Sequence, residues 1–293
     1  MEDVFFVPEI YAGTYMTHSI RIKALLLTVL LIGAFAVVWH IYVSGAVGDS
    51  GMDPEYAALM GEASKGGSNL PGPLDVAATV WSHITSPVTY PGTSQPGLLI
   101  QISFSIGRVM IGFGLAAAVA IPIGFAIGMS PLWNRALNPI IQVLKPISPL
   151  AWLPLALYTI KDAEMSAIFV IFICSLWPMM INTSFGVMSV RREWLNVART
   201  LEVRPLRMAL RVILPAAAPT IMTGMRISIG IAWLVIVAAE MLVGGTGIGY
   251  FVWNEWNNLE ITNIITAILL VGIVGMLLDA ALAGAARLTA YSE

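Results

Sequence analysis

Six long apolar runs constrain the fold of this chain more than any other feature. They cover residues 24–43, 98–129, 136–160, 163–190, 215–243 and 261–288. A helix needs about 20 mostly apolar residues to cross the hydrocarbon core of a bilayer, and every run reaches that length. Hydrophobic residues make up 58% of the chain and charged residues only 11%, whereas soluble proteins carry roughly 25% charged residues. We therefore predict an all-α, polytopic membrane protein with six transmembrane helices.

The first run has an alternative interpretation as a secretory signal, because Arg21 and Lys23 precede it. The apolar part of a signal sequence has about 7–15 residues, and this run is longer. We interpret it as a retained membrane span. The chain then divides into an N-terminal segment at 1–23, a first span at 24–43, a long loop at 44–97 and a core of five spans at 98–288.

The third run is the least regular, because prolines interrupt it. Proline inside a helix removes a hydrogen bond and kinks the chain. Such breaks persist in membranes where other helices or a water-filled cavity satisfy the freed backbone groups. We therefore expect this span to face protein or a transport pathway. The prolines are Pro139, Pro146, Pro149 and Pro154.

The distribution of Lys and Arg in the connections predicts the orientation, because cytoplasmic loops carry an excess of both. Both termini are predicted to be cytoplasmic, in agreement with an even number of spans. The loop at 44–97 is then extracytoplasmic. Within it, one face of a short amphipathic helix would carry Leu74, Ala77, Ala78 and Trp81. The cytoplasmic side would carry Arg21, Lys23, Arg135, Arg191, Arg192, Arg199, Arg204, Arg207, Arg211 and Arg287, and the other side only Lys65 and Lys161.

An Arg-rich stretch at 196–226 interrupts the apolar pattern between the fourth and fifth spans. Apolar residues recur at helical spacing before and after a turn at 202–205, and Pro205 suits the first turn of the second helix. The pattern predicts two amphipathic helices with their apolar faces against the membrane core and their tip in the cytoplasm. A basic loop that binds anionic lipid headgroups is the competing interpretation.

The stretch resembles the signature loop of ABC-importer permeases, which reads E-A-A, three residues, Gly, nine residues, then I-x-L-P. Asn196-Val197-Ala198 take the place of E-A-A, Glu202 takes the place of the glycine, and 212–215 (V-I-L-P) match the end of the motif. Asn196 replaces an acidic residue and Glu202 replaces the glycine. The tight turn that glycine permits is therefore expected to be made in another way.

The resemblance extends from about residue 70 to about residue 279. It includes LPGPLDV, SFSIGRVMIGFGLAAAVAIPIGFAIGMS, KPISPLAWLPLAL, INTSFGV, ILPAAAPTIMTGMRISIGIAWLVIVAAEML and GTGIGYFVWNEWN. This ordered set is similar to permeases that import nitrate or nitrite, bicarbonate, sulfonates and taurine. It looks most like the nitrate and bicarbonate members. The first expectation is nitrate or nitrite import, with bicarbonate, and then sulfonate or taurine, as alternatives.

The resemblance implies a mechanism and a set of partners in a bacterial inner membrane. Two permeases, expected to be two copies, would pair above two cytoplasmic ATP-binding subunits, and an extracytoplasmic binding protein would deliver the anion. The chain has no G-x-x-x-x-G-K-S/T phosphate loop, so ATP and Mg²⁺ are expected on the partner and the chain itself is not expected to be an enzyme. The coupling helix that docks onto the ATPase would comprise Asn196, Val197, Ala198, Glu202, Val203, Arg204, Pro205, Leu206 and Arg207.

Charged residues within the predicted spans need partners, because each costs about 2.5–3.5 kcal/mol or more at mid-bilayer. Arg226 and Asp279 fall at similar depths on neighbouring antiparallel spans, so we predict a structural ion pair. Glu240 lies about 21 Å farther along the fifth span than Arg226 and needs another partner. The candidates to line an anion pathway are Arg108, Lys145, Trp152, Asn182, Trp233 and Glu240, with helix packing or ion pairing as the competing role.

Several other classes of function find little support. A net charge of −2 gives no reason to expect nucleic acid, and membrane lipid is the remaining expected partner. The single Cys174 excludes an internal disulfide, and His18, His40 and His83 lack the spacing of metal ligands. Motifs such as H-E-x-x-H and G-x-S-x-G are absent, which argues against an intramembrane enzyme. A channel or secondary transporter that works without ATP remains the alternative class.

Overall fold

The computed structural model describes residues 14–46, 70–86 and 96–289. The chain separates into two compact units, Met1–Ala78 and Thr79–Glu293. Lys65 and most of the loop predicted at 44–97 lie outside the described residues, as does the start of the N-terminal segment predicted at 1–23. The regular elements of the described part are helices, and the predicted all-α class is confirmed.

The first unit contains the long helix α1 (Thr14–Ala46). Its stretch 22–44 is long and apolar enough to cross a membrane, as the sequence predicts for 24–43. The short helix expected in the following loop is α3 (Pro73–Thr85), which begins in the first unit and ends in the second. Leu74 and Trp81 of its apolar face are 75% and 67% exposed.

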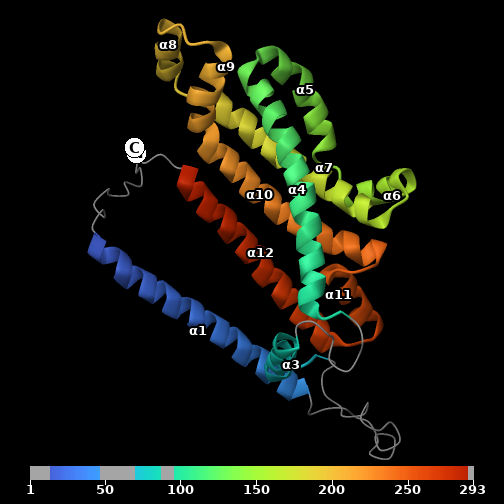
Figure 1. The fold of residues 1–293 in the computed structure, drawn as a ribbon. Helices are drawn as coiled ribbons and strands as arrows, with labels where there is room; N and C mark the ends of the chain where they lie inside the picture. The colour runs from blue at the N-terminus through green and yellow to red at the C-terminus, as the bar shows by residue number, and fades with distance from the viewer. Residues whose placement is uncertain (1–13, 47–69, 87–95, 290–293) are drawn as a thin grey trace, which may run out of the picture. The chain divides into compact units, whose positions relative to one another are not determined.

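The second unit contains the remaining helices (Figure 1). A short π-helical segment, η2, lies between α9 and α10. In chain order the elements are α4 (Leu98–Met129), α5 (Pro131–Leu144), α6 (Pro149–Ile160), α7 (Ala163–Met188), α8 (Arg192–Thr200), α9 (Pro205–Met208), η2 (Ala209–Ile213), α10 (Leu214–Val243), α11 (Ile248–Asn257) and α12 (Ile261–Thr289).

The core of this unit forms where α7 packs against both α4 and α10. Glycines let the backbones approach closely, as is typical of helices in membranes. A Cβ atom on Gly124 would lie 2.6 Å from the carbonyl oxygen of Met180, and one on Gly224 would lie 2.6 Å from Cβ of Asn182. The most deeply buried side chains include Val109, Ala116 and Ala120 of α4, Ile171 and Met179 of α7, and Ala232 and Ile236 of α10.

Five helical stretches are long and apolar enough to span a membrane, and the third predicted span differs from them. It consists of α5 and α6, which meet at an angle of 93°, so the described residues give six spans only if this pair counts as one. The prolines explain the break. Ser148, which precedes Pro149, has an extended backbone (ψ 136°), because the proline ring disfavours the helical conformation at the residue before it.

The fifth span begins earlier than the run at 215–243 predicts. An apolar helical stretch extends over Pro205–Val243, from α9 through η2 into α10. The second amphipathic helix predicted after the turn does begin at Pro205, and it continues into the fifth span. The wider turns of η2 let the chain continue from one to the other without a break.

Candidate functional site

The segment that matches the signature loop folds into a hairpin of α8, a tight turn and α9, which we name the signature hairpin (192–208). Figure 1 places it at the end of α7 and the beginning of α10. The end of α8 is closed by two backbone hydrogen bonds, from Val203 N to Ala198 O (3.0 Å) and from Glu202 N to Arg199 O (2.9 Å). This pair of bonds is the Schellman motif, in which one residue adopts a left-handed conformation.

Glu202 is the left-handed residue, with a φ of 49°. The turn is therefore made without glycine, as expected, but not by a different backbone conformation. The backbone keeps the geometry that suits glycine, and a glutamate occupies it. A left-handed conformation costs a residue with a Cβ atom roughly 1–2 kcal/mol, so the hydrogen bonds of the turn must outweigh local strain.

The apolar residues of the signature hairpin and of the following η2 are less buried than their pattern predicts. Ala198 and Ile213 are buried, and Leu195 and Met208 pack beside Val187 of α7. Trp194, Val197, Leu201, Leu206 and Leu210 are instead between 43% and 73% exposed. The short α8 turns Ala198 and Leu195 inward, and its other large apolar side chains, Trp194 and Val197, are exposed, as are Arg204 and Arg207 after the turn.

Arg226 and Asp279 face each other on α10 and α12. The guanidinium forms two parallel hydrogen bonds, from Nε to Oδ1 (3.0 Å) and from Nη2 to Oδ2 (2.7 Å). Their side chains are 41% and 49% exposed. The bidentate geometry is the strongest form of an Arg–carboxylate pair, and it compensates both charges within the apolar stretch.

Glu240, whose partner the sequence leaves open, lies in a buried polar network and is 2% exposed. Arg108 Nη1 donates to Glu240 Oε1 (2.8 Å) and to the carbonyl oxygen of Thr246 (2.5 Å). The hydroxyl of Ser105 lies 2.8 Å from each oxygen of the Glu240 carboxylate. Gly249 N donates to Glu240 Oε2 (3.0 Å).

This network fixes the start of α11. Ile248 N donates to Ser105 Oγ (3.0 Å), so two of the first amides of α11 are bound by side chains. A carboxylate is favourable there, because the free amides at a helix N-terminus carry partial positive charge. Gly249 permits the contact, since a Cβ atom at that position would overlap the carbonyl group of Val237. Arg108 and Glu240 thus hold α4, α10 and α11 together.

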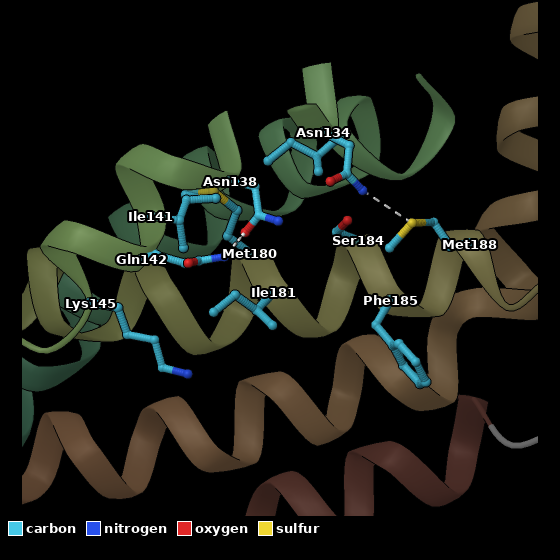
Figure 2. Close-up of a pocket in the computed structure, with 11 residues that line it drawn as sticks. Asn134, Asn138, Ile141, Gln142, Lys145, Met180, Ile181, Ser184, Phe185 and Met188 are labelled. Carbon is cyan, nitrogen blue, oxygen red and sulfur yellow. Dashed lines mark hydrogen bonds between the residues drawn. The ribbon is translucent and has the colours of Figure 1, made fainter. Parts of the chain in front are cut away.

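A cavity of about 320 Å³ lies between α5 and α7 (Figure 2). Lys145, one of the predicted pathway residues, lines it at the end of α5. Three further polar residues of α5 that are not among the predicted pathway residues line it as well: Asn134, Asn138 and Gln142. Their spacing of four residues places them on one face of a helix, and this pattern within an apolar stretch could have predicted a polar lining. The α7 wall consists of Met180, Ile181, Ser184, Phe185 and Met188.

The remaining pathway candidates lie elsewhere in the core. Asn182 Nδ2 donates to the carbonyl oxygen of Pro178 (2.8 Å), and Trp233 Nε1 donates to that of Val271 (2.8 Å). Trp152 is partly buried against the hydrophobic core. The structure therefore brings Arg108 and Glu240 together and places Lys145 beside a cavity, but it does not gather all six candidates at one site. Within the described residues, no cluster of His, Cys, Asp or Glu is suited to hold a metal ion.

Comparison with known proteins identifies the family. Residues 95–289 match the model described as binding-protein-dependent transport system inner membrane component. The nitrate import permease protein NrtB of Synechocystis sp. is 45% identical over 248 residues, which cover 85% of this chain and 83% of that protein. The bicarbonate transport system permease protein CmpB of the same organism is 42% identical over 203 residues, or 69% of this chain and 72% of that protein.

A solved structure supports the same fold. An inward-facing structure of the MetNI methionine ABC transporter matches with a TM-score of 0.60 at 15% identity, over 66% of this chain and 96% of the matched chain. At this identity the match establishes the fold alone. The family match covers most of the second unit, and the curated relatives match over most of their own length. The chain therefore belongs to the binding-protein-dependent transport system inner membrane components, the multi-pass permease subunits of ABC importers.

Proposed function

We propose that this permease carries a small inorganic oxyanion, nitrate or nitrite first and bicarbonate second, in an importer driven by ATP. The observation that carries the ATP-driven part is the signature hairpin. Its tip exposes Leu201 and Leu206 beside Arg204 and Arg207, a combination of apolar and basic groups that suits a protein partner. The choice of anion is supported by the similarity to NrtB and, at somewhat lower identity, to CmpB.

In this proposal the energy comes from a partner subunit that binds ATP and Mg²⁺. The nine predicted coupling residues (196–198 and 202–207) form the docking element, with Ala198 supporting it from the buried side. A second copy of the chain would complete the pathway, and a binding protein would deliver the anion to the opposite face. Both chain termini and the signature hairpin would lie in the cytoplasm.

The proposal assigns different tasks to the charged residues inside the spans. Arg108 and Glu240 already compensate each other and bind the start of α11, so we assign them a structural role. Arg226 and Asp279 are likewise assigned to packing of α10 against α12. Lys145 is the cation left for the pathway, beside polar side chains of α5.

Competition for uptake distinguishes the candidate substrates. The permease would be expressed with its ATPase and binding protein in cells that lack their own nitrate uptake, and labelled nitrate would be supplied at low concentration. We expect unlabelled nitrate and nitrite to compete strongly, bicarbonate less, and taurine not at all. Uptake of labelled taurine or bicarbonate, with no uptake of nitrate, would reassign the transporter to that substrate.

A further inference from the structure

One face of α5 is polar although the helix lies in an apolar run. Asn134, Asn138, Gln142 and Lys145 are spaced by four, four and three residues. At about 100° per residue these positions fall within an arc of roughly 80° on the helix surface. Trp133, Leu137 and Ile140 lie on another face and line a separate apolar groove. The polar face of α5 is the one that lines the cavity (Figure 2).

The cavity extends from the beginning of α5 to its break. Asn134 Nδ2 lies 3.3 Å from the sulfur of Met188, the last residue of α7, and Lys145 follows the last residue of α5. A helix rises about 1.5 Å per residue, so the polar face reaches roughly 16 Å, or about half of a hydrocarbon core about 30 Å thick. The cavity therefore leads from the end of the core that bears the signature hairpin towards its middle.

The electrostatics of the cavity favour an anion. Among the described residues, Lys145 is the one cation that lines it, and no Asp or Glu does. Arg108 and Arg226 in the neighbouring spans each contact a carboxylate instead. An ammonium group without a counter-charge is costly within a membrane, and both water and an anion reduce that cost.

The amides of α5 supply hydrogen-bond donors at the same surface. Gln142 Nε2 donates to Asn138 Oδ1 (3.1 Å), which leaves the amide nitrogen of Asn138 to donate to another group. Asn134 Nδ2 lies against the weakly accepting sulfur of Met188. A cavity of about 320 Å³ holds a small oxyanion together with several waters, each of which occupies about 30 Å³ in the liquid.

We infer that the transported oxyanion passes along this cavity in partly hydrated form, with Lys145 as its counter-charge near the middle of the core and Gln142, Asn138 and Asn134 as successive donors to its oxygens along the way. The inference rests on the proposed function, since it assumes that the cargo is a small anion. One cation and neutral amides make a weak site, and a weak site lets the ion leave again after each transport cycle.

Replacing and then restoring the charge at residue 145 tests the inference. Lys145→Cys would be made in a Cys174→Ala background and reconstituted with the ATPase and binding protein. We expect nitrate uptake to fall at least about tenfold, the effect of losing one hydrogen bond to a charged group. Treatment with 2-aminoethyl methanethiosulfonate attaches a new ammonium group and should restore most of the uptake. The 2-sulfonatoethyl reagent, which attaches an anion, should not.

Two further variants control for structural damage. Arg135→Cys removes a cation from the same helix outside the cavity lining, and neither reagent should change its uptake by more than about twofold. Gln142→Cys keeps Lys145, and nitrate should slow its modification by the sulfonate reagent several-fold. If Lys145→Cys does not assemble, this protection decides the question: protection supports the inference and its absence overturns it.

The outcomes separate the inference from the proposed function. If the Cys174→Ala parent imports neither nitrate nor bicarbonate, the proposed function fails and the inference fails with it. If the parent imports nitrate and Lys145→Cys does so equally well, only the inference is overturned. Equal recovery with both reagents also overturns it, because the size of the side chain and not its charge would then matter.

Discussion

Glu202 is the residue where sequence and backbone disagree most clearly. It occupies a left-handed conformation at the position where the family motif has glycine. We expect Glu202→Gly to stabilise the protein by about 0.5–1 kcal/mol, because relief of the Cβ strain exceeds the extra entropy that glycine gives the unfolded chain. The thermal midpoint of the purified permease should rise slightly.

The control for this variant is Glu193→Gly, which lies in the first turn of α8. Glycine at a helical position should destabilise by up to about 1 kcal/mol, so the two substitutions should have effects of opposite sign. A fall in thermal midpoint with Glu202→Gly would mean that the glutamate side chain makes contacts that the turn requires.

The Arg108–Glu240 pair provides a second prediction for single residues. Glu240→Gln leaves Arg108, whose side chain is 12% exposed, beside a neutral amide, with only the exposed Glu164 carboxylate 3.7 Å away. Loss of one partner of a buried pair costs about 3–5 kcal/mol, so we expect much less folded permease in the membrane. The double variant Arg108→Gln/Glu240→Gln should lose less than the sum of the two single losses. Fluorescence-detected size-exclusion chromatography measures each yield, and additive losses would contradict the coupling.

The sequence predicts some of these contacts and not others for a physical reason. The ion pair of Arg226 and Asp279 can be predicted from the sequence, because the position of a residue along each of two antiparallel spans fixes its depth in the membrane. The partner of Glu240 depends on how α4, α10 and α11 meet, since Arg108 precedes it by 132 residues. The sequence pattern around Arg108 or Glu240 does not show how these three helices meet.

At the scale of elements, the signature hairpin carries the main functional prediction. The double variant Arg204→Glu/Leu206→Asp reverses a charge and removes an apolar anchor at its tip, where Leu206 is 73% exposed. Losses of about 2 kcal/mol or more, equivalent to roughly 30-fold weaker binding, are common for such residues. We expect normal insertion into the membrane but loss of the ATPase in a pull-down.

A matched control separates docking from lipid binding. Leu210→Asp/Arg211→Glu makes the same change in charge farther along the same segment, and Leu210 is 56% exposed. A lipid-binding loop would respond similarly to both double variants, whereas a docking tip would respond mainly to the first. Normal assembly and ATPase stimulation with the first variant would refute the docking role.

Hydrophobic patterns in the sequence predict most of the helices, but they do not predict where each helix begins and ends. The run at 136–160 is continuous in composition, yet it folds as α5 and α6 at 93°. The prolines predict a break in this span, but they do not predict the angle between α5 and α6, which depends on packing against α7. Pro205 marks the start of a helix in the sequence, but the charged residues between it and the run at 215–243 give no indication that this helix is continuous with the fifth span.

For the whole molecule, the balance of Lys and Arg predicts an orientation that labelling tests. In a Cys174→Ala background, Ser64→Cys should react with a membrane-impermeant maleimide from outside the cell. Arg204→Cys should react only after the membrane is opened. Ser64 lies outside the described residues, so this prediction rests on sequence alone. Labelling of both positions from outside would contradict the predicted six-span topology.

The most direct test of the central claim measures nitrate uptake into proteoliposomes that contain the permease and its ATPase. With nitrate-loaded binding protein on the outer side, we predict uptake that requires ATP and Mg²⁺ inside and continues when ionophores collapse every ion gradient. The Arg204→Glu/Leu206→Asp variant should abolish it. Uptake by the permease alone, without ATP, or loss of uptake when the gradients collapse, would contradict an ATP-driven importer and indicate a channel or secondary transporter.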